Sequence, residues 1–141
     1  MKRLVFAILL LAWIFSPPGA AVAGVKVGVT VALPPPILFP APPMLVVLPE
    51  TQVYVAPDIE AEIYFHNGWW WRPWGGRWYR SRYYDSGWAY HRHVPAFYGK
   101  ISPGWRNDYR EHRWRGREWT YERIPHERVQ RGWKGGMRGR R

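Results

Sequence analysis

The residues that decide the fold are 62–80, which read EIYFHNGWWWRPWGGRWYR. Aromatic residues, which favour pleated strands, surround the pairs Asn67-Gly68 and Gly75-Gly76. Both pairs suit the positive φ angles of a type I′ turn, a common connection in tight hairpins. A third pair, Ser86-Gly87, follows before the next tryptophan. The pattern predicts an antiparallel meander of about four strands over residues 61–93.

The segment before the meander is apolar and rich in proline. Valines alternate with small or polar residues through residues 24–33, which predicts a strand. Six prolines in ten residues then predict an extended, polyproline-like segment over residues 34–49, which ends in a short apolar strand at residues 44–48. We therefore place the aromatic antiparallel meander at residues 50–98.

The segment after the meander, residues 99–131, is basic and is predicted to be partly helical. A tryptophan and a tyrosine four residues apart predict a short helix within residues 105–114, with Asn107 or Asp108 as its N-cap. A weak alternation of residue types then predicts a returning strand within residues 114–123.

The last segment is predicted to hold one more helical turn and a tail. Pro125 opens the turn, which carries Val129 and Trp133 on one side. Residues 132–141 are rich in Gly and Arg and are predicted to be a disordered basic tail. The expected fold class is therefore mainly β, with a small antiparallel meander sheet and a short helical basic C-terminal extension.

The N-terminus has the pattern of a secretory signal peptide over residues 1–23. Lys2 and Arg3 precede an uncharged run from Leu4 to Phe15, and the small residues of Ala21-Val22-Ala23 fit a cleavage site. The run is too short to span a membrane, which takes about 20 residues. We expect an exported protein of the periplasm or cell envelope, with no transmembrane span once the signal is removed.

The composition argues against several classes of chemistry. The absence of cysteine removes disulfides, thiolate metal sites and thiol catalysis. The serines after residue 23 lie in turn-like sequences and not in a G-x-S-x-G elbow, and Glu60 and Glu62 have the pattern of surface charge near a turn. We therefore expect no enzyme activity and no cofactor.

Arginine interleaved with aromatic residues is the main binding signal. The chain carries 21 Lys and Arg against 10 Asp and Glu, and thirteen of the basic residues lie in residues 99–141. Most rings are expected in the core with arginine stems packed over them, while exposed rings and guanidinium groups can stack on ligands and bind anions. The candidate binding residues are Arg72, Arg77, Arg80, Arg82, Arg106, Arg110, Arg113, Arg115, Arg117, Trp74, Trp78 and Trp88.

The segment from Trp69 to Tyr79 resembles a group of exported bacterial proteins of unknown function. Their Pro-rich N-termini are followed by Trp/Tyr/Gly β-repeats of the Y-x-W-G-x-W kind, and the resemblance covers roughly residues 34–98. The spacing here, Trp74-Gly75-Gly76-Arg77-Trp78, departs from the strict motif. The resemblance implies a small envelope-associated β protein without known catalysis, and it carries over no functional residues.

We expect a binding or structural role at an anionic or glycan surface, with an anionic envelope polymer or a membrane surface as partner. This interpretation has no metal site. One alternative is a periplasmic metal-handling protein that uses His91 and His93, which share one side of a strand. Another is a nucleic-acid-binding protein that uses the same arginines, although export argues against that partner. The oligomeric state is left open by the sequence.

Overall fold

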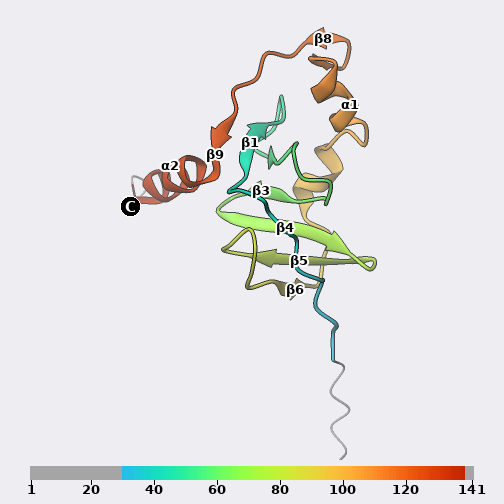
Figure 1. Cartoon of the computed structure of the whole chain (residues 1–141), viewed down its shortest axis with the longest axis vertical. Helices are drawn as coiled ribbons and strands as arrows, with labels where there is room; N and C mark the ends of the chain where they lie inside the picture. The colour runs from blue at the N-terminus through green and yellow to red at the C-terminus, as the bar shows by residue number, and fades with distance from the viewer. Residues whose placement is uncertain (1–29, 139–141) are drawn as a thin grey trace, which may run out of the picture. The chain divides into compact units, whose positions relative to one another are not determined.

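A computed structural model describes residues 30–138, and these form one large sheet, a small hairpin, two α-helices and a 3₁₀ helix (Figure 1). The predicted signal peptide, most of the predicted strand 24–33 and the end of the predicted tail lie outside the described residues. The chain divides into two units, residues 1–30 and 31–141, and every element below belongs to the second. No helix within residues 30–138 is long and apolar enough to cross a membrane.

The mainly β fold class is confirmed, and the large sheet is an antiparallel meander with one long-range addition. Its strand order is β6-β5-β4-β3-β2-β1-β9, and Figure 1 shows β3 to β6 following one another in this order. The strands are β1 (Met44–Val47), β2 (Tyr54–Val55), β3 (Tyr64–His66), β4 (Trp69–Trp74), β5 (Arg77–Ser81), β6 (Ala89–His91) and β9 (Ile124–Pro125).

Two tight hairpins lie at the predicted glycine pairs. Asn67 and Gly68, which join β3 to β4, have φ angles of 50° and 77°. Gly75 and Gly76, which join β4 to β5, have φ angles of 55° and 70°. Four positive angles are what type I′ turns require, so local backbone chemistry sets the register of the meander.

The third predicted hairpin, at Ser86-Gly87, is a longer loop. Strand β5 ends at Ser81 and β6 begins only at Ala89. The Ser81 hydroxyl is buried, donates to the Ser86 carbonyl and accepts from the Tyr83 N–H. A side chain therefore closes this loop in place of backbone pairing between strands, because a serine hydroxyl can hydrogen-bond nearby backbone groups that would otherwise pair in a sheet.

Core residues lie on both faces of the sheet, and neighbouring positions of its central strands are therefore both apolar. Alternate residues of a strand point to opposite faces, and the core accordingly forms two clusters. The first contains Val46, Val55, Tyr64, Trp71 and Trp78, and the second contains Leu45, Phe65, Trp70, Tyr79 and Trp88.

The first face is covered by the segment that follows the meander. This segment contains η1 (Ala96–Lys100), α1 (Trp105–Arg110) and the hairpin of β7 (Arg113–Trp114) and β8 (Arg117–Glu118). It contributes four buried rings to the first cluster, from Phe97, Trp105, Trp114 and Trp119. Aromatic residues of the segment packed on this face thus supply a large part of the core, where the sheet itself has few aliphatic residues.

The second face is covered by the Pro-rich segment and by α2 (His126–Arg138). Pro34 is buried, and the carbonyl groups of Ala32 and Pro35 each accept a 2.7 Å hydrogen bond, from the Tyr79 hydroxyl and from the Arg72 guanidinium. The segment forms no helix or strand over residues 30–43, so residues 30–33 are not paired as the predicted strand. It contacts the sheet through backbone carbonyl groups, which are free to accept these bonds because the segment is not paired in a strand.

The C-terminal elements differ from the prediction in three places. Helix α1 begins at Trp105 with Gly104 at its N-cap, so Asn107 and Asp108 lie inside the helix and cannot cap it. The returning strand is the β7–β8 hairpin, whose turn at Arg115-Gly116 has φ angles of 50° and 80°.

Helix α2 is the third difference, because it continues where a disordered tail was predicted from residue 132. It extends to Arg138 and is preceded by β9, which pairs with β1. Val129 and Trp133 lie on its inner side and pack on the second cluster. This packing outweighs the low helix propensity of its glycines.

Candidate functional site

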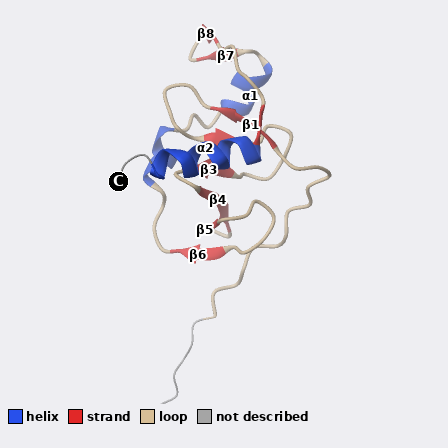
Figure 2. Ribbon diagram, turned by 90° about the vertical axis from the view of Figure 1, so that its left-hand side faces the viewer, coloured by secondary structure: helices blue, strands red, loops and turns tan. Residues whose placement is uncertain are grey.

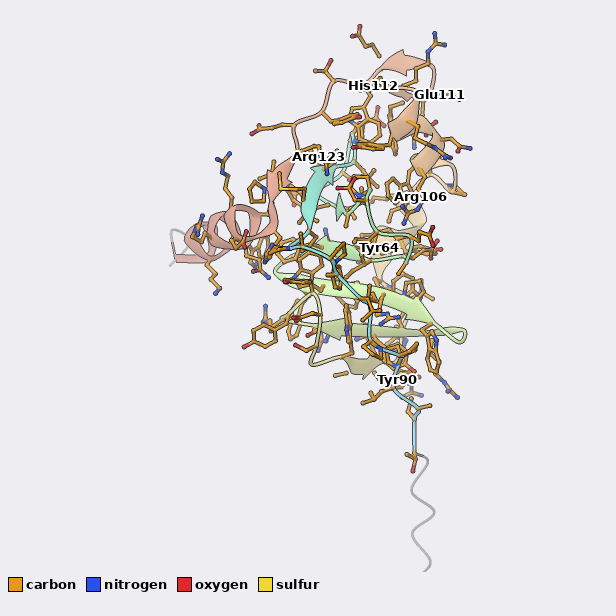
Figure 3. The ribbon with its side chains drawn as sticks, in the orientation of Figure 1. Tyr64, Tyr90, Arg106, Glu111, His112 and Arg123 are labelled. Atoms are coloured by element: carbon orange, nitrogen blue, oxygen red, sulfur yellow. The ribbon has the colours of Figure 1, made fainter. Side chains whose placement is uncertain are left out.

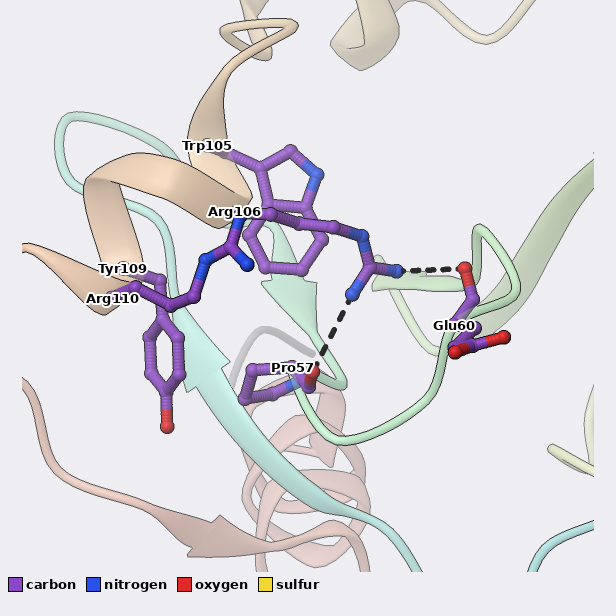
Figure 4. A pocket seen from close by; sticks show the side chains of 6 residues that line it. All are labelled: Pro57, Glu60, Trp105, Arg106, Tyr109 and Arg110. Atoms are coloured by element: carbon purple, nitrogen blue, oxygen red, sulfur yellow. Dashed lines mark hydrogen bonds between the residues drawn. The ribbon is translucent and has the colours of Figure 1, made fainter.

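Two of the predicted binding arginines are held by backbone carbonyls inside the fold. Arg106 on α1, labelled in Figure 3, donates to the carbonyl groups of Pro57, Ile59, Glu60 and Ala61 at 2.8–3.4 Å, and Figure 4 draws the bonds to Pro57 and Glu60. Arg72 is buried, its guanidinium carbon lies 5.4 Å from the Trp88 ring centroid, and burial lowers its pKa. Both arginines stabilise the fold: Arg106 binds four carbonyl groups of one loop, and Arg72 is too buried to reach a ligand, although its Nε has no hydrogen-bond partner in the described residues.

Two more of the predicted arginines stack on one tryptophan ring. The guanidinium carbon of Arg80 lies 4.4 Å from the Trp69 ring centroid, and that of Arg82 lies 3.5 Å from it. Arg82 also donates to the Gly68 carbonyl at 2.8 Å. Arg80 is half-buried, whereas Arg82 is exposed, so Arg82 is both fixed in position and open to a ligand.

The remaining predicted arginines are exposed. Arg115 forms an ion pair with Glu50 at 3.0 Å, and Arg110 donates to the Asn107 side chain. Arg77, Arg113 and Arg117 form no ion pair within residues 30–138. Arg113 faces Glu118 across the hairpin, so the positive potential there is partly offset.

The three predicted tryptophans are not alike. Trp78 and Trp88 are buried in the core, where their ring faces touch other side chains of this chain. Trp74 is exposed at the end of β4. Of the three, Trp74 alone presents a ring to solvent.

The two histidines of the metal alternative lie close together. The His91 and His93 ring centroids are 6.3 Å apart, and the His91 ring packs edge-on against Trp71. Desolvation, with the nearby charges of Arg80 and His93, lowers the pKa of His91. In residues 30–138 no group of three His, Cys, Asp or Glu side chains is placed to hold a metal ion.

A groove beside α2 brings together residues from three parts of the chain, and Figure 2 shows α2 lying across the strands near β3. The groove has a volume of about 390 Å³. It is lined by Phe65, Gly68, Arg82, Tyr83, Gln130, Trp133 and Lys134. Two of these side chains are cations and none is a carboxylate, which favours an anionic ligand.

Contacts across the α2 groove hold its walls in place. The Gln130 side chain donates to the Arg82 carbonyl at 3.3 Å, which joins α2 to the loop after β5. The Trp133 ring packs directly over Gly68, and its indole N–H is a buried donor with no partner in the described residues. Tyr83 is 64% exposed, so its ring is open to stacking.

Two other cavities contain acidic residues. One, of about 300 Å³, is lined by Glu60 together with Arg106 and Arg110 (Figure 4). The other, of about 520 Å³, is lined by Glu50, His66 and Lys100 among others. A cavity of about 450 Å³ shares Phe65 and Trp133 with the α2 groove and has Arg128 as its only charged lining residue, so it extends the groove as a carboxylate-free surface.

The sequence predicts only some of the residues that line the α2 groove. Arg82 is a predicted binding residue, but Tyr83, Gln130 and Lys134 are not. The four-residue spacing of Val129 and Trp133 indicates the inward face of a helix. A helix with that inward face places the polar residues near them, such as Gln130, outside the core. The pairing of that helix with the β3–β4 turn has no local sequence signal.

No protein-family model, curated protein or solved structure matches the chain. The resemblance to the Trp/Tyr/Gly-repeat proteins therefore stays a prediction.

Proposed function

We propose that this is an exported, non-catalytic protein that binds acidic glycan chains of the cell envelope in the α2 groove. The observation that carries the proposal is that Arg82 and Lys134 line one groove with an exposed tyrosine and without a carboxylate. Export rests on the signal-peptide pattern of residues 1–23.

The chemistry of the groove supports an acidic sugar as ligand. Arg82 is fixed by the Trp69 ring and the Gly68 carbonyl, and it keeps further N–H donors for a carboxylate or phosphate. Lys134 adds a second positive charge, and the Tyr83 ring offers a flat apolar face to a sugar. Because Arg82 is already ordered, little conformational entropy is lost when it binds.

Titration of the full chain with polygalacturonate, polyphosphate and neutral dextran tests this proposal. We expect binding to both polyanions, not to dextran, and weaker binding at high salt because exposed charges are screened. Lys134→Ala should lower the affinity about tenfold, the lower end for a lost charge-assisted hydrogen bond. Arg131→Ala is the matched control, since Arg131 is exposed on the same helix but does not line the groove.

A third variant separates a glycan from a plain anion. Tyr83→Ala should weaken binding of polygalacturonate and leave binding of polyphosphate unchanged, because only the sugar polymer has rings to stack. Equal losses for Lys134→Ala and Arg131→Ala would mean that the net charge of α2, and not the groove, determines binding. Binding of dextran as tight as that of polygalacturonate would also contradict the proposal.

A further inference from the structure

A patch of exposed apolar side chains lies at the outer edge of the sheet, away from the α2 groove. Within residues 30–138 it contains four of the six large apolar residues that are exposed: Leu33 (63%), Trp74 (36%), Tyr90 (44%) and Val94 (63%). We call these four residues, with Arg77 and Arg92, the β6 edge. Exposed apolar patches on a folded protein mark surfaces that meet a partner.

Three residues of the β6 edge, Leu33, Trp74 and Tyr90, lie around one buried ring, and Val94 follows β6 by three residues. The Tyr79 ring centroid lies 6.2 Å from that of Trp74 and 6.0 Å from that of Tyr90. The Tyr79 hydroxyl donates to the Ala32 carbonyl, which places the adjacent Leu33 beside them. Figure 3 labels Tyr90 near the point at which the chain enters the described fold.

Two arginines lie at the β6 edge, and the acidic residue that comes before it along the chain is Asp85, in the loop between β5 and β6. Arg77 faces Trp74 across the β4–β5 turn and Arg92 directly follows β6. Both are exposed, and neither forms an ion pair in the part of the chain that the structure describes. The stretches 30–49, 69–84 and 88–104 contain no Asp or Glu. An anionic surface would therefore meet no repelling charge on these segments.

We propose that the β6 edge docks on the headgroup region of an anionic lipid membrane. Tryptophan and tyrosine partition to the membrane–water interface, arginines are attracted to anionic headgroups, and exposed aliphatic side chains enter the acyl boundary. Leu33 and Val94 favour a lipid surface over a polysaccharide, which has no acyl chains to receive them. This inference goes beyond the glycan-binding proposal and rests on different residues.

Site-specific labelling of the full chain tests the orientation of docking. The chain has no cysteine, so Val94→Cys provides one position for a polarity-sensitive dye. With vesicles of phosphatidylglycerol and phosphatidylcholine in equal parts, we expect a blue shift and a rise in emission. Thr120→Cys is the control, because Thr120 is exposed but follows the β7–β8 hairpin, and its dye should not respond. A response at position 120 and none at position 94 would overturn the proposal.

Vesicle affinity supplies the second measurement. Each arginine near an anionic surface contributes about 1 kcal/mol, so Arg77→Gln with Arg92→Gln should lower affinity for the mixed vesicles about 30-fold. Wild type and this double variant share the same N-terminal segment, whose contribution cancels in the comparison. Failure of the wild type to bind mixed vesicles, or equal affinity of wild type and double variant, would refute docking. Neither result affects polygalacturonate binding by the α2 groove, so the two proposals fail separately.

Discussion

Gly68 is the position at which one added methyl group tests both the fold and the α2 groove. It has a φ of +77° in the β3–β4 turn, and a Cβ there would lie 2.2 Å from the Trp133 indole nitrogen and 2.5 Å from its Cδ1. No rotation of an alanine methyl relieves such a contact. Gly68→Ala must therefore strain the backbone and also displace the Trp133 ring, and α2 with it.

The two costs have different sizes. A non-glycine residue in the left-handed region costs about 1–2 kcal/mol. A large aromatic side chain buries about 200 Å², and uncovering half of that at about 25 cal/mol per Å² adds about 2.5 kcal/mol. Gly68→Ala should thus lower the free energy of unfolding by about 4 kcal/mol.

Gly76→Ala is the matched control because it separates the backbone cost from the packing cost. Gly76 holds the same second position in its turn, with a φ of +70°, and nothing lies within 4 Å of its added Cβ. We expect it to cost only the backbone term, about 1–2 kcal/mol. Urea denaturation of both variants measures the difference, and equal costs would refute the contact of Trp133 with the turn.

Two further predictions concern polar groups that are held inside the fold. Arg106→Met should lower the free energy of unfolding by about 2 kcal/mol in urea denaturation, because carbonyl groups between residues 57 and 61 lose a charged donor. The control, Arg110→Met, should change it by less than about 0.5 kcal/mol. Equal effects would contradict the structural role of Arg106. Burial, reinforced by the charge of Glu62, raises the pKa of Tyr64 in the folded protein. The unfolded chain therefore loses this proton at a lower pH than the folded chain does. Stability should fall as the pH rises above about 10, by at most about 1.4 kcal/mol per pH unit. Denaturation of wild type and Tyr64→Phe between pH 9 and 11 checks this, and an identical fall in both would exclude Tyr64 as its source.

The parts of the fold that the sequence predicts are those set by local chemistry. Asn67-Gly68 and Gly75-Gly76 turn where glycine and asparagine tolerate positive φ, whatever lies around them. The apolar run that begins at Met44 is a strand for a similar reason. These features depend only on residues that are neighbours along the chain.

The missed parts depend on residues that are far apart in the chain. Ile124 and Pro125 become a strand only because Met44 and Leu45 present a free edge to them. Their short sequence, with a proline, does not resemble a strand by itself. Likewise, α2 persists through Gly132 because Trp133 packs over Gly68, which is 65 residues earlier in the chain. Such contacts are tertiary, so the helix or strand propensity of neighbouring residues does not predict them.

The candidate binding residues were also predicted only in part. An arginine can either bind carbonyl groups of its own chain or bind a ligand, and its position in the sequence does not show which. A guanidinium group has five donors, and a loop with unpaired carbonyls will bind it as readily as a ligand will. Arg106 binds loop carbonyls in this way, and Arg72 binds the Pro35 carbonyl and is buried, whereas Arg82 is oriented by Trp69 and stays exposed. The excess of basic residues therefore overstates the binding surface, and the arginines available to a ligand are those that the fold orients and leaves exposed.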